Sequence, residues 1–500
     1  MSLLEPGNPK PLASNLLLLA FSFIPFTLYL FHPMPIDAVK PTAHASSDDP
    51  QFVRRMALQI LRAIDQRGQT LDTALEDFRQ KHPLARQRDR ALLQTLVFGV
   101  LRWRGRIDFV IGTFSRTPLT KIQPDILNIL RMALFQVMFL DRIPVSAAVN
   151  TAVELAKPLA PDWVVRFVNA VLRKAAAGYK KVSFPVLEQN PVAALAASKS
   201  FPPWLIRHWL HQFSPDETAA LCDAVNTIPP VTLRANTLKI QRGVLLQALT
   251  DEGGTVATAS MAPEALLLRH PQKPIEEFHT FQRGWFQVQD EAAQLVTILL
   301  DPQPGERVLD ACAGLGGKTG HIAQRMQNTG VVVALDVNAA KLKMLTAEMA
   351  RLGISIVRPC NADLSSGRLS DNHGPYDRIL LDAPCSGLGV LRRNPDAKWS
   401  VEETALGDCG RRQVEFLNRL AVQVKPGGVL VYAVCSSEPE EGEAVVDAFM
   451  KNHPDYRLEN AADYLPRFVD SPLTRDGFLK TYPHRHGSDG FFSARFRRMP

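Results

Sequence analysis

The feature that most constrains the fold is a regular alternation of apolar stretches and amphipathic segments that begins at Gly305. The apolar stretches, such as RVLDACAG and YDRILLDAPC, are separated by segments that repeat apolar residues at helical spacing. Near-continuous apolar strands are typical of a parallel sheet covered by helices on both faces. Residues 291–500 are therefore predicted to form a doubly wound parallel sheet, with GFLKTYPH and GFFSARFRR as an antiparallel pair at its edge.

The upstream part of the chain has a different organisation. Residues 50–182 repeat apolar residues at helical spacing, as at Leu92, Leu96 and Val100, and predict a helical domain. Residues 195–290 mix short helices with alternating stretches such as PPVTLRANTLK, which predict a small α+β unit. Three domains are thus expected after an N-terminal extension, residues 1–49.

The N-terminal extension contains an uncharged apolar run, Leu16–Phe31. This run is short for a membrane span, and Pro25 interrupts it. It can be read as an anchor, as a signal peptide with only Lys10 before it, or as a segment upstream of a true start at Met34. These alternatives stay open.

The charge and the cysteine content limit the kinds of partner and functional site that this chain can have. A net charge of +7 is compatible with an anionic partner. The six cysteines include no CxxC pair, which argues against a zinc site and against a disulfide framework. We expect a chain without metal in a reducing compartment, the cytoplasm, where a functional cysteine would act as a thiolate.

The glycine-rich loop after the first strand reads DACAGLGGKT. A phosphate-binding loop would need glycine where Cys312 stands, and the dinucleotide fingerprint would need glycine where Thr319 stands. Asp336, at the end of the second strand, can accept hydrogen bonds from ribose hydroxyls. Asp363, after the third strand, is placed to contact an adenine amino group. An adenosine moiety without pyrophosphate indicates S-adenosylmethionine.

Two cysteines, Cys385 and Cys435, follow the fourth and fifth strands, so we expect both thiols in one cleft. Carbon 5 of cytosine becomes nucleophilic only after a thiolate adds to carbon 6, and release then needs a base. Cys435, Asp382 and Cys385 could act as nucleophile, as acid near the base and as the group that assists release. The residues alone leave open which thiol attacks. DNA cytosine methyltransferases use a cysteine that follows a proline, and by that rule Cys385 would be the nucleophile.

Two basic stretches are candidate RNA contacts. After Cys385, the cations of Arg392, Arg393 and Lys398 could bind phosphates, and Trp399 could stack on an unpaired base. A loop nucleotide is the expected target, because a paired cytosine would have to swing out of its duplex. The second stretch lies in the helical domain and comprises Arg86, Arg88, Arg90, Arg102, Arg104 and Arg106.

Three motifs carry a resemblance to a known family. DACAGLGGKTGH, LDAPCSGLGVLRRNPDAKW and YAVCSSEPEEGEAVV resemble the successive signatures of the NOL1/NOP2/Sun family of RNA cytosine-5 methyltransferases. The helical part is similar to the RNA-binding transcription factor NusB, and this fusion marks the bacterial Sun/Fmu (RsmB) branch, which methylates 16S ribosomal RNA. The resemblance implies a NusB-like helical bundle, a small α+β RNA-recognition unit and a Rossmann-like, S-adenosylmethionine-dependent methyltransferase domain.

The resemblance also implies roles for single residues. Cys435 would be the nucleophile, Cys385 would assist product release, and Asp382 would bind the target base beside the cofactor. The family loop more often has Ala-Pro at positions 314–315, a difference that loosens the turn but leaves its main-chain contacts possible. S-adenosylmethionine would be held by Cys312, Ala313, Gly314, Leu315, Gly316, Gly317, Lys318, Asp336, Asp363 and Asp382.

The expected function is methyl transfer to carbon 5 of a cytosine in 16S ribosomal RNA, unassembled or partly assembled. We expect a monomer without an obligate protein partner. One alternative is an enzyme of the same family acting on transfer RNA, against which the helical domain argues. The other is a non-catalytic RNA-binding or antitermination factor, against which the two intact cysteines argue.

Overall fold

The structure is a computed structural model that describes residues 51–81, 86–366, 374–467 and 473–500. The apolar run at Leu16–Phe31 and the extension that contains it lie outside the described residues. Across the described ranges, no helix is long and apolar enough to cross a membrane.

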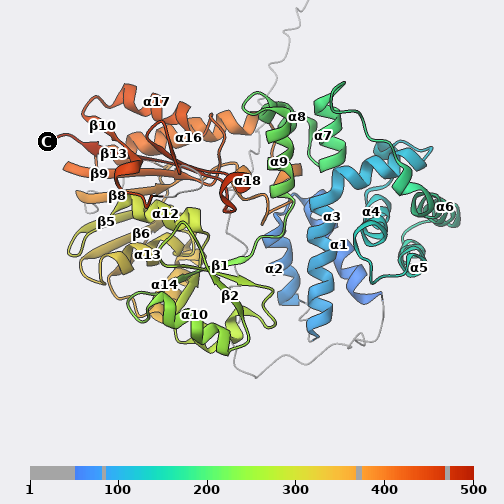
Figure 1. Cartoon of the computed structure of the whole chain (residues 1–500), viewed down its shortest axis with the longest axis horizontal. Helices are drawn as coiled ribbons and strands as arrows, with labels where there is room; N and C mark the ends of the chain where they lie inside the picture. Colours follow the sequence, from blue (N-terminus) through green and yellow to red (C-terminus); the bar gives the residue numbers. More distant parts are fainter. Residues whose placement is uncertain (1–50, 82–85, 367–373, 468–472) are drawn as a thin grey trace, which may run out of the picture.

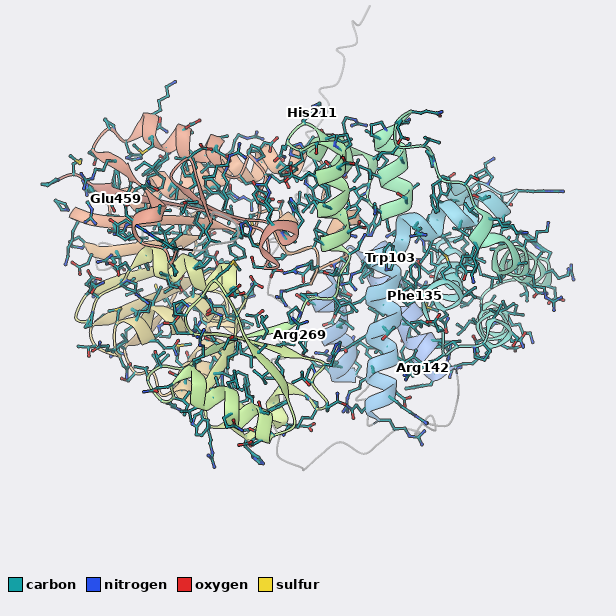
Figure 2. All side chains as sticks on the ribbon, viewed as in Figure 1. Trp103, Phe135, Arg142, His211, Arg269 and Glu459 are labelled. Carbon is teal, nitrogen blue, oxygen red and sulfur yellow. The ribbon has the colours of Figure 1, made fainter. Side chains whose placement is uncertain are left out.

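Helices α1 to α6 form a helical domain at one end of the molecule (Figure 1). Gly99 lets two of them approach closely, because a Cβ atom there would overlap the ring of Phe135. Trp103 stacks on Phe139 with ring centroids 4.9 Å apart, and Trp103 and Phe135 both lie within this domain (Figure 2). The helices are α1 (Phe52–Arg67), α2 (Leu71–Lys81), α3 (Gln87–Phe114), α4 (Pro124–Phe139), α5 (Val145–Ala156) and α6 (Asp162–Gly178).

Three further helices connect this domain to the rest of the chain: α7 (Pro191–Lys199), α8 (Pro203–Leu210) and α9 (Pro215–Val225). Helix α7 contacts α3, while α9 contacts α18 (Pro483–His486) near the C-terminus. Apolar residues of α7, α8 and α9 share a buried cluster with the segment that follows Cys385, so these helices pack against the C-terminal domain, residues 291–500.

The small unit has a ferredoxin-like βαββαβ arrangement with an antiparallel sheet of order β2-β3-β1-β4. Side chains alternate along β1, so Leu233 faces the unit's own helices while Arg234 faces the C-terminal domain. The elements are β1 (Val231–Ala235), α10 (Arg242–Asp251), β2 (Thr255–Thr258), β3 (Ala265–Arg269), α11 (His279–Gln282) and β4 (Phe286–Val288).

The C-terminal domain contains the predicted doubly wound sheet, with order β11-β12-β13-β9-β8-β5-β6-β7. The parallel strands are β5 (Arg307–Ala311), β6 (Val331–Asp336), β7 (Val357–Asn361), β8 (Tyr376–Asp382) and β9 (Val424–Val434). The chain runs outward from β5 to β7 and then returns to β8 on the other side of β5. Ligands of such sheets bind at this switch point, beyond the carboxyl ends of the strands.

The predicted antiparallel pair is present, but the outermost strand on this side of the sheet is β11, which lies outside the pair. Strands β12 (Phe478–Thr481) and β13 (Phe491–Arg498) are paired, yet β13 is inserted between β12 and β9. The antiparallel part also includes β10 (Tyr456–Glu459) and β11 (Thr474–Arg475). Strand β13 therefore closes the parallel sheet beside the strand that precedes Cys435.

Helices cover both faces of the sheet (Figure 1). Successive residues of a strand point to opposite faces of the sheet and pack into different hydrophobic cores. Val308 belongs to one core and Leu309 to the other. One core lies under α12 (Glu291–Leu300), α13 (Gly317–Arg325) and α14 (Ala339–Leu352), and the other under α16 (Thr404–Ala421) and α17 (Glu443–Asn452).

Candidate active site

The glycine-rich loop makes a tight turn between β5 and α13. Cys312 adopts a left-handed conformation with φ 68°, which is uncommon for a residue with a side chain. Gly316 has φ 87°, and a Cβ atom on it would overlap Leu345. Gly316 is also the N-cap of α13 and offers no side chain to the free N–H groups of the first turn. The loop thus exposes main-chain donors at the switch point of the sheet.

Asp336 is fixed beside this loop at the end of β6. Its two carboxylate oxygens accept hydrogen bonds from the N–H groups of Gly314, at 2.9 Å, and of Asn338, at 2.8 Å. Asp363, two residues beyond β7, is exposed and accepts a hydrogen bond of 2.7 Å from the N–H of Ser365. The hydrogen bonds from Ser365 lower the pKa of Asp363. Both carboxylates therefore lie at the carboxyl ends of the parallel strands, on the same side of the sheet as the glycine-rich loop.

An ion pair connects the loop to the next strand of the site. The ammonium of Lys318 lies 2.6 Å from a carboxylate oxygen of Asp382, at the end of β8. Burial alone would lower the pKa of Lys318, but attraction to Asp382 outweighs it and the pKa is raised. The negative charge of a Cys435 thiolate acts in the same direction, and the ring of Phe491 lies 5.3 Å from the ammonium.

The two predicted thiols converge. The Sγ atoms of Cys385 and Cys435 are 3.2 Å apart, although 50 positions separate them in the chain. Cys385 is 4% exposed, whereas Cys435 is only partly buried. The hydrogen bond with Cys435, followed by burial, raises the pKa of the Cys385 thiol well above its usual value. Cys385 therefore keeps its proton at neutral pH and can donate it in a hydrogen bond to the sulfur of Cys435.

A buried carboxylate holds the Cys385 segment in place. Glu441 is fully buried and accepts hydrogen bonds from both the N–H, at 2.8 Å, and the hydroxyl of Ser386. Gln413 donates to the same carboxylate at 3.1 Å and to the carbonyl of Pro384 at 3.0 Å. These contacts fix the residues on either side of Cys385 and thereby its thiol.

The Cys435 segment is held by its own contacts. The N–H of Gly389 donates to the carbonyl of Cys435 at 3.0 Å, and a Cβ atom on Gly389 would overlap the carbonyl of Gly490. Three residues further on, the buried carboxylate of Glu438 accepts hydrogen bonds of 3.0 Å from the indole N–H of Trp209 and from the side-chain amide of Gln212. A helix outside the sheet, α8, thus anchors the segment that carries the thiol.

Sequence reasoning did not identify Glu438 and Glu441 as parts of the site. They belong to the run EPEE after Cys435, and acidic runs are more often solvent-exposed than buried. Their partners Trp209 and Ser386 are 229 and 55 positions away in the chain, so no local pattern marks the contacts.

The expected RNA contacts after Cys385 need correction, because these residues are engaged inside the protein. Lys398 is 0% exposed, and its amino group donates to the side-chain oxygen of Asn226 at 2.6 Å. The indole N–H of Trp399 donates to the carbonyl of Leu101 at 2.7 Å. An amino group enclosed in this way cannot reach a phosphate.

The Arg392–Arg393 pair is likewise internal. Arg392 lies 3.1 Å from a carboxylate oxygen of Asp489, and Arg393 lies 2.6 Å from the other oxygen of Asp489 and 2.8 Å from Asp290. The two carboxylates raise the pKa of Arg393, although burial alone would lower it. The pair therefore joins the segment after Cys385 to the start of α12 and to the C-terminal hairpin.

Three arginines of α3 in the second predicted basic stretch also make contacts inside the protein. Arg102 is buried and donates to the carbonyl of Arg392 at 2.6 Å. Arg104 pairs with Asp65 at 2.8 Å, and the guanidinium of Arg106 lies 5.2 Å from the ring of Phe184. This half of the predicted basic stretch is not a free surface.

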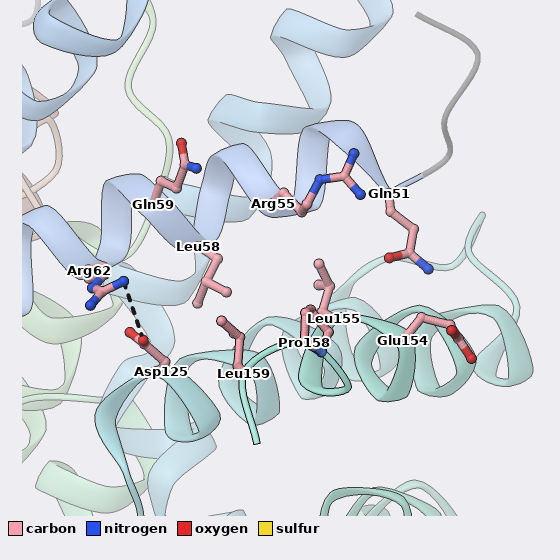
Figure 3. A pocket seen from close by; sticks show the side chains of 10 residues that line it. All are labelled: Gln51, Arg55, Leu58, Gln59, Arg62, Asp125, Glu154, Leu155, Pro158 and Leu159. Atoms are coloured by element: carbon pink, nitrogen blue, oxygen red, sulfur yellow. Dashed lines mark ion pairs between the residues drawn. The ribbon is translucent and has the colours of Figure 1, made fainter. Parts of the chain in front are cut away.

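A pocket of about 190 Å³ opens in the helical domain (Figure 3). It lies between α1 and the helices α4 and α5, and Leu58 and Leu155 are among its apolar lining. Arg62 pairs across it with Asp125 at 3.6 Å. The pocket is outside the catalytic domain, so we assign it no part in the chemistry. Among the described residues, no group of three or more His, Cys, Asp or Glu could hold a metal ion.

The parallel sheet with its antiparallel β13, the glycine loop and the two strand-end carboxylates define a Rossmann-like methyltransferase domain. Comparison of the chain with family models agrees. Residues 297–497 match the model "16S rRNA methyltransferase RsmB/F", residues 51–177 match the NusB family, and residues 201–275 match the ferredoxin-like domain of RsmF/B-like methyltransferases.

Two curated relatives are similar over nearly their whole length. The probable ribosomal RNA small subunit methyltransferase B of Synechocystis is 36% identical, over 89% of this chain and 99% of the relative. The protein of the same description from Bacillus subtilis is 36% identical, over 89% and 98%. The crystal structure of PH0851 matches with a TM-score of 0.74 and 27% identity, over 90% of this chain and 99% of that one. The chain belongs to the RsmB family of 16S rRNA methyltransferases.

Proposed function

We propose that the protein methylates carbon 5 of a cytosine in 16S ribosomal RNA, through a covalent bond between Cys435 and carbon 6 of the base. The observation that carries the proposal is the 3.2 Å approach of two thiols from neighbouring strands. The ion pair of Lys318 with Asp382 connects this sulfur pair to the glycine loop. The RsmB relatives are ribosomal RNA small subunit methyltransferases by description, which favours 16S RNA over transfer RNA as the substrate.

The residues of the loop fit S-adenosylmethionine. The left-handed backbone of Cys312 and Gly316 and the uncapped start of α13 leave main-chain N–H groups available to a ligand. Asp336 and Asp363 offer carboxylate oxygens for ribose and adenine groups, as proposed from the sequence. When bound, S-adenosylmethionine would supply an electrophilic methyl group. The cofactor residues would be the loop from Cys312 to Lys318 with Asp336, Asp363 and Asp382.

Cys435 is the nucleophile in this proposal. It is the more exposed of the two thiols, and the ammonium of Lys318 interacts favourably with its thiolate. The protonated thiol of Cys385 can donate a hydrogen bond to that thiolate. When Cys435 adds to carbon 6, a new carbon–sulfur bond forms and the electron pair of the 5,6 double bond moves toward carbon 5 and N3. Carbon 5 is then able to attack an electrophile.

Asp382 and Lys318 would act on the base and Cys385 on product release. A group near N3 or N4 must stabilise charge that builds up on the ring, and the Lys318–Asp382 pair, which holds a proton between its two side chains, would serve this purpose. Release requires transfer of the proton on carbon 5 to a base such as water, after which the carbon–sulfur bond breaks, the double bond re-forms and Cys435 leaves as a thiolate. The protonated thiol of Cys385, 3.2 Å from the Cys435 sulfur, would assist by donating a hydrogen bond to the leaving thiolate. We propose that the enzyme acts in the cytoplasm on free or partly assembled RNA.

The test is methyl incorporation into a 16S RNA transcript from radiolabelled S-adenosylmethionine, with 5-methylcytidine identified by mass spectrometry. Cys435→Ser is expected to abolish incorporation and to keep RNA affinity. A transfer RNA transcript serves as the control substrate. Full activity of Cys435→Ser, or a methyl group on another atom, would show that the proposed chemistry is wrong.

A further inference from the structure

We propose that the outward face of α6 is a docking surface for ribosomal RNA, at a place remote from the target cytosine. The inference rests on the proposed function, because it assumes an RNA substrate. We call this surface the α6 face and define it by the exposed residues Trp163, Arg166, Arg173, Lys174, Lys180 and Lys181.

Helix α6 is amphipathic. Its inward side is buried in the helical core through Val168, Val171, Leu172 and Ala175. The residues at positions 163, 166, 173 and 174 fall within about 100° on the opposite side, given 3.6 residues per turn. The two lysines at 180 and 181 continue the surface beyond the end of the helix.

The α6 face carries charge of nearly one sign. Between residues 162 and 181 there are five cations and a single acidic residue, Asp162. Among the residues that the structure describes, no carboxylate forms an ion pair with any of the five cations. Arg166 and Arg173 are two turns apart, about 10 Å along the axis. Such a row of unneutralised cations matches the regularly spaced phosphates of a nucleic acid.

An aromatic residue completes the surface. Trp163 is 66% exposed, whereas the chain's other five tryptophans are buried or half-buried. An exposed indole beside a guanidinium is suited to stack on an unpaired base. A protein partner fits less well, because the centre of a protein interface is usually depleted in lysine and charged groups.

The position of α6 determines what the surface can do. The helix packs on α3, α4 and α5 and lies at the end of the molecule opposite the catalytic sheet (Figure 1). RNA on this face is therefore far from the thiols, and its contacts hold the substrate without touching the reacting base. Loss of the face should weaken RNA binding and raise KM, with kcat unchanged.

The experiment compares two triple variants that remove the same charge. Arg166→Gln/Arg173→Gln/Lys174→Gln changes the α6 face. Three exposed cations at the far edge of the catalytic domain are changed in the control, Lys451→Gln/Arg457→Gln/Arg475→Gln. Affinity for a protein-free 16S transcript is measured by filter binding over a range of salt concentrations, and methyl transfer is measured on the same transcript.

The α6 variant is expected to bind the transcript about tenfold more weakly, and the slope of log affinity against log salt should become shallower by about 2, since each lost phosphate contact removes about 0.7 to 0.9. The control should stay within about twofold of the unmodified protein, because a mere loss of net charge affects both variants equally. Trp163→Ala, at a position that is 66% exposed, should weaken binding about tenfold by loss of stacking.

Equal affinity and slope in the α6 variant and the control would overturn the proposal. A defect seen only with assembled small subunits would assign the face to a ribosomal protein and would overturn it too. Iodide quenching of tryptophan fluorescence gives an independent readout: the transcript should protect Trp163 if it docks there. Absence of methyl transfer by the unmodified protein would refute the proposed function, whereas RNA binding can still be compared between the variants.

Discussion

The guanidinium of Arg234, on β1 of the small unit, donates a hydrogen bond of 2.8 Å to the carbonyl of Gly317, the first residue of α13. Arg234 is completely buried and also donates to Gln324 of α13 at 2.7 Å and to Gln287 of β4 at 2.6 Å. The small unit therefore supports the turn that would bind the cofactor, in addition to any contact it makes with RNA.

Replacement of Arg234 tests whether the small unit supports the glycine-rich loop. Arg234→Met should lower the free energy of unfolding by about 3 kcal/mol, because several buried acceptors lose a charged donor. Affinity for S-adenosylmethionine should fall as well, since Gly317 belongs to the loop. Urea denaturation and titration calorimetry measure the two effects. Arg269→Met, on the exposed side of β3 (Figure 2), is the control; equal effects of the two changes would contradict the inferred role.

Local patterns were sufficient to predict the sheet and the arrangement of its functional loops. Near-continuous apolar stretches separated by amphipathic segments predicted the parallel strands, and the position of Cys385 and Cys435 after the fourth and fifth of them predicted the approach of the two thiols. These predictions succeed because a parallel sheet brings the carboxyl ends of its strands to one edge, whatever the rest of the chain does.

Long-range packing was not predictable in the same way. The sequence shows Lys398 as one cation in a basic run, but its surroundings come from α3 and from the residues around Ser200 and Asn226. Burial of a lysine depends on which distant segments cover it, and no spacing rule reports this. The same reason explains why Glu438 and its partner Trp209 were not recognised as part of the site.

The role of Cys385 in release has a distinctive consequence. Cys385→Ser should still form the bond between Cys435 and the base, but release should be slow, because the group beside the adduct has lost its thiol. A protein–RNA adduct should then accumulate and remain stable on a denaturing gel. The double variant Cys385→Ser/Cys435→Ser should show none. If the single variant turns over without an adduct, Cys385 has no part in release.

His208 gives the Cys435 segment a pH dependence. Its ring lies 2.9 Å from the carboxylate of Glu438 and 3.5 Å from that of Glu440, and contact with Glu438 raises its pKa above 6.5. The protonated ring is thus favoured by folding. Its stabilising contribution is fully present below the unfolded pKa of about 6.5 and is lost as pH rises through the higher folded pKa.

The measurement compares melting temperatures across this pH window. Unmodified protein should exceed His208→Gln at about pH 6, and the difference should shrink by about pH 9. His211→Gln, which changes an exposed residue just beyond α8 (Figure 2), is the matched control. A difference that grows with pH would mean that the neutral ring is the favoured form.

The pH dependence of stability tests whether Lys398 is a buried structural residue, not an RNA contact. Burial, followed by repulsion from Arg102, lowers the pKa of Lys398 well below its usual value. Folding therefore disfavours the charged form, so stability should rise relative to Lys398→Met as pH increases toward the unfolded pKa of about 10.4, by up to about 1.4 kcal/mol per pH unit. RNA affinity and its salt slope should match those of the unmodified protein, with Lys451→Met as an exposed control. A severalfold loss of RNA affinity in Lys398→Met alone, without a change in stability, would restore Lys398 as an RNA contact.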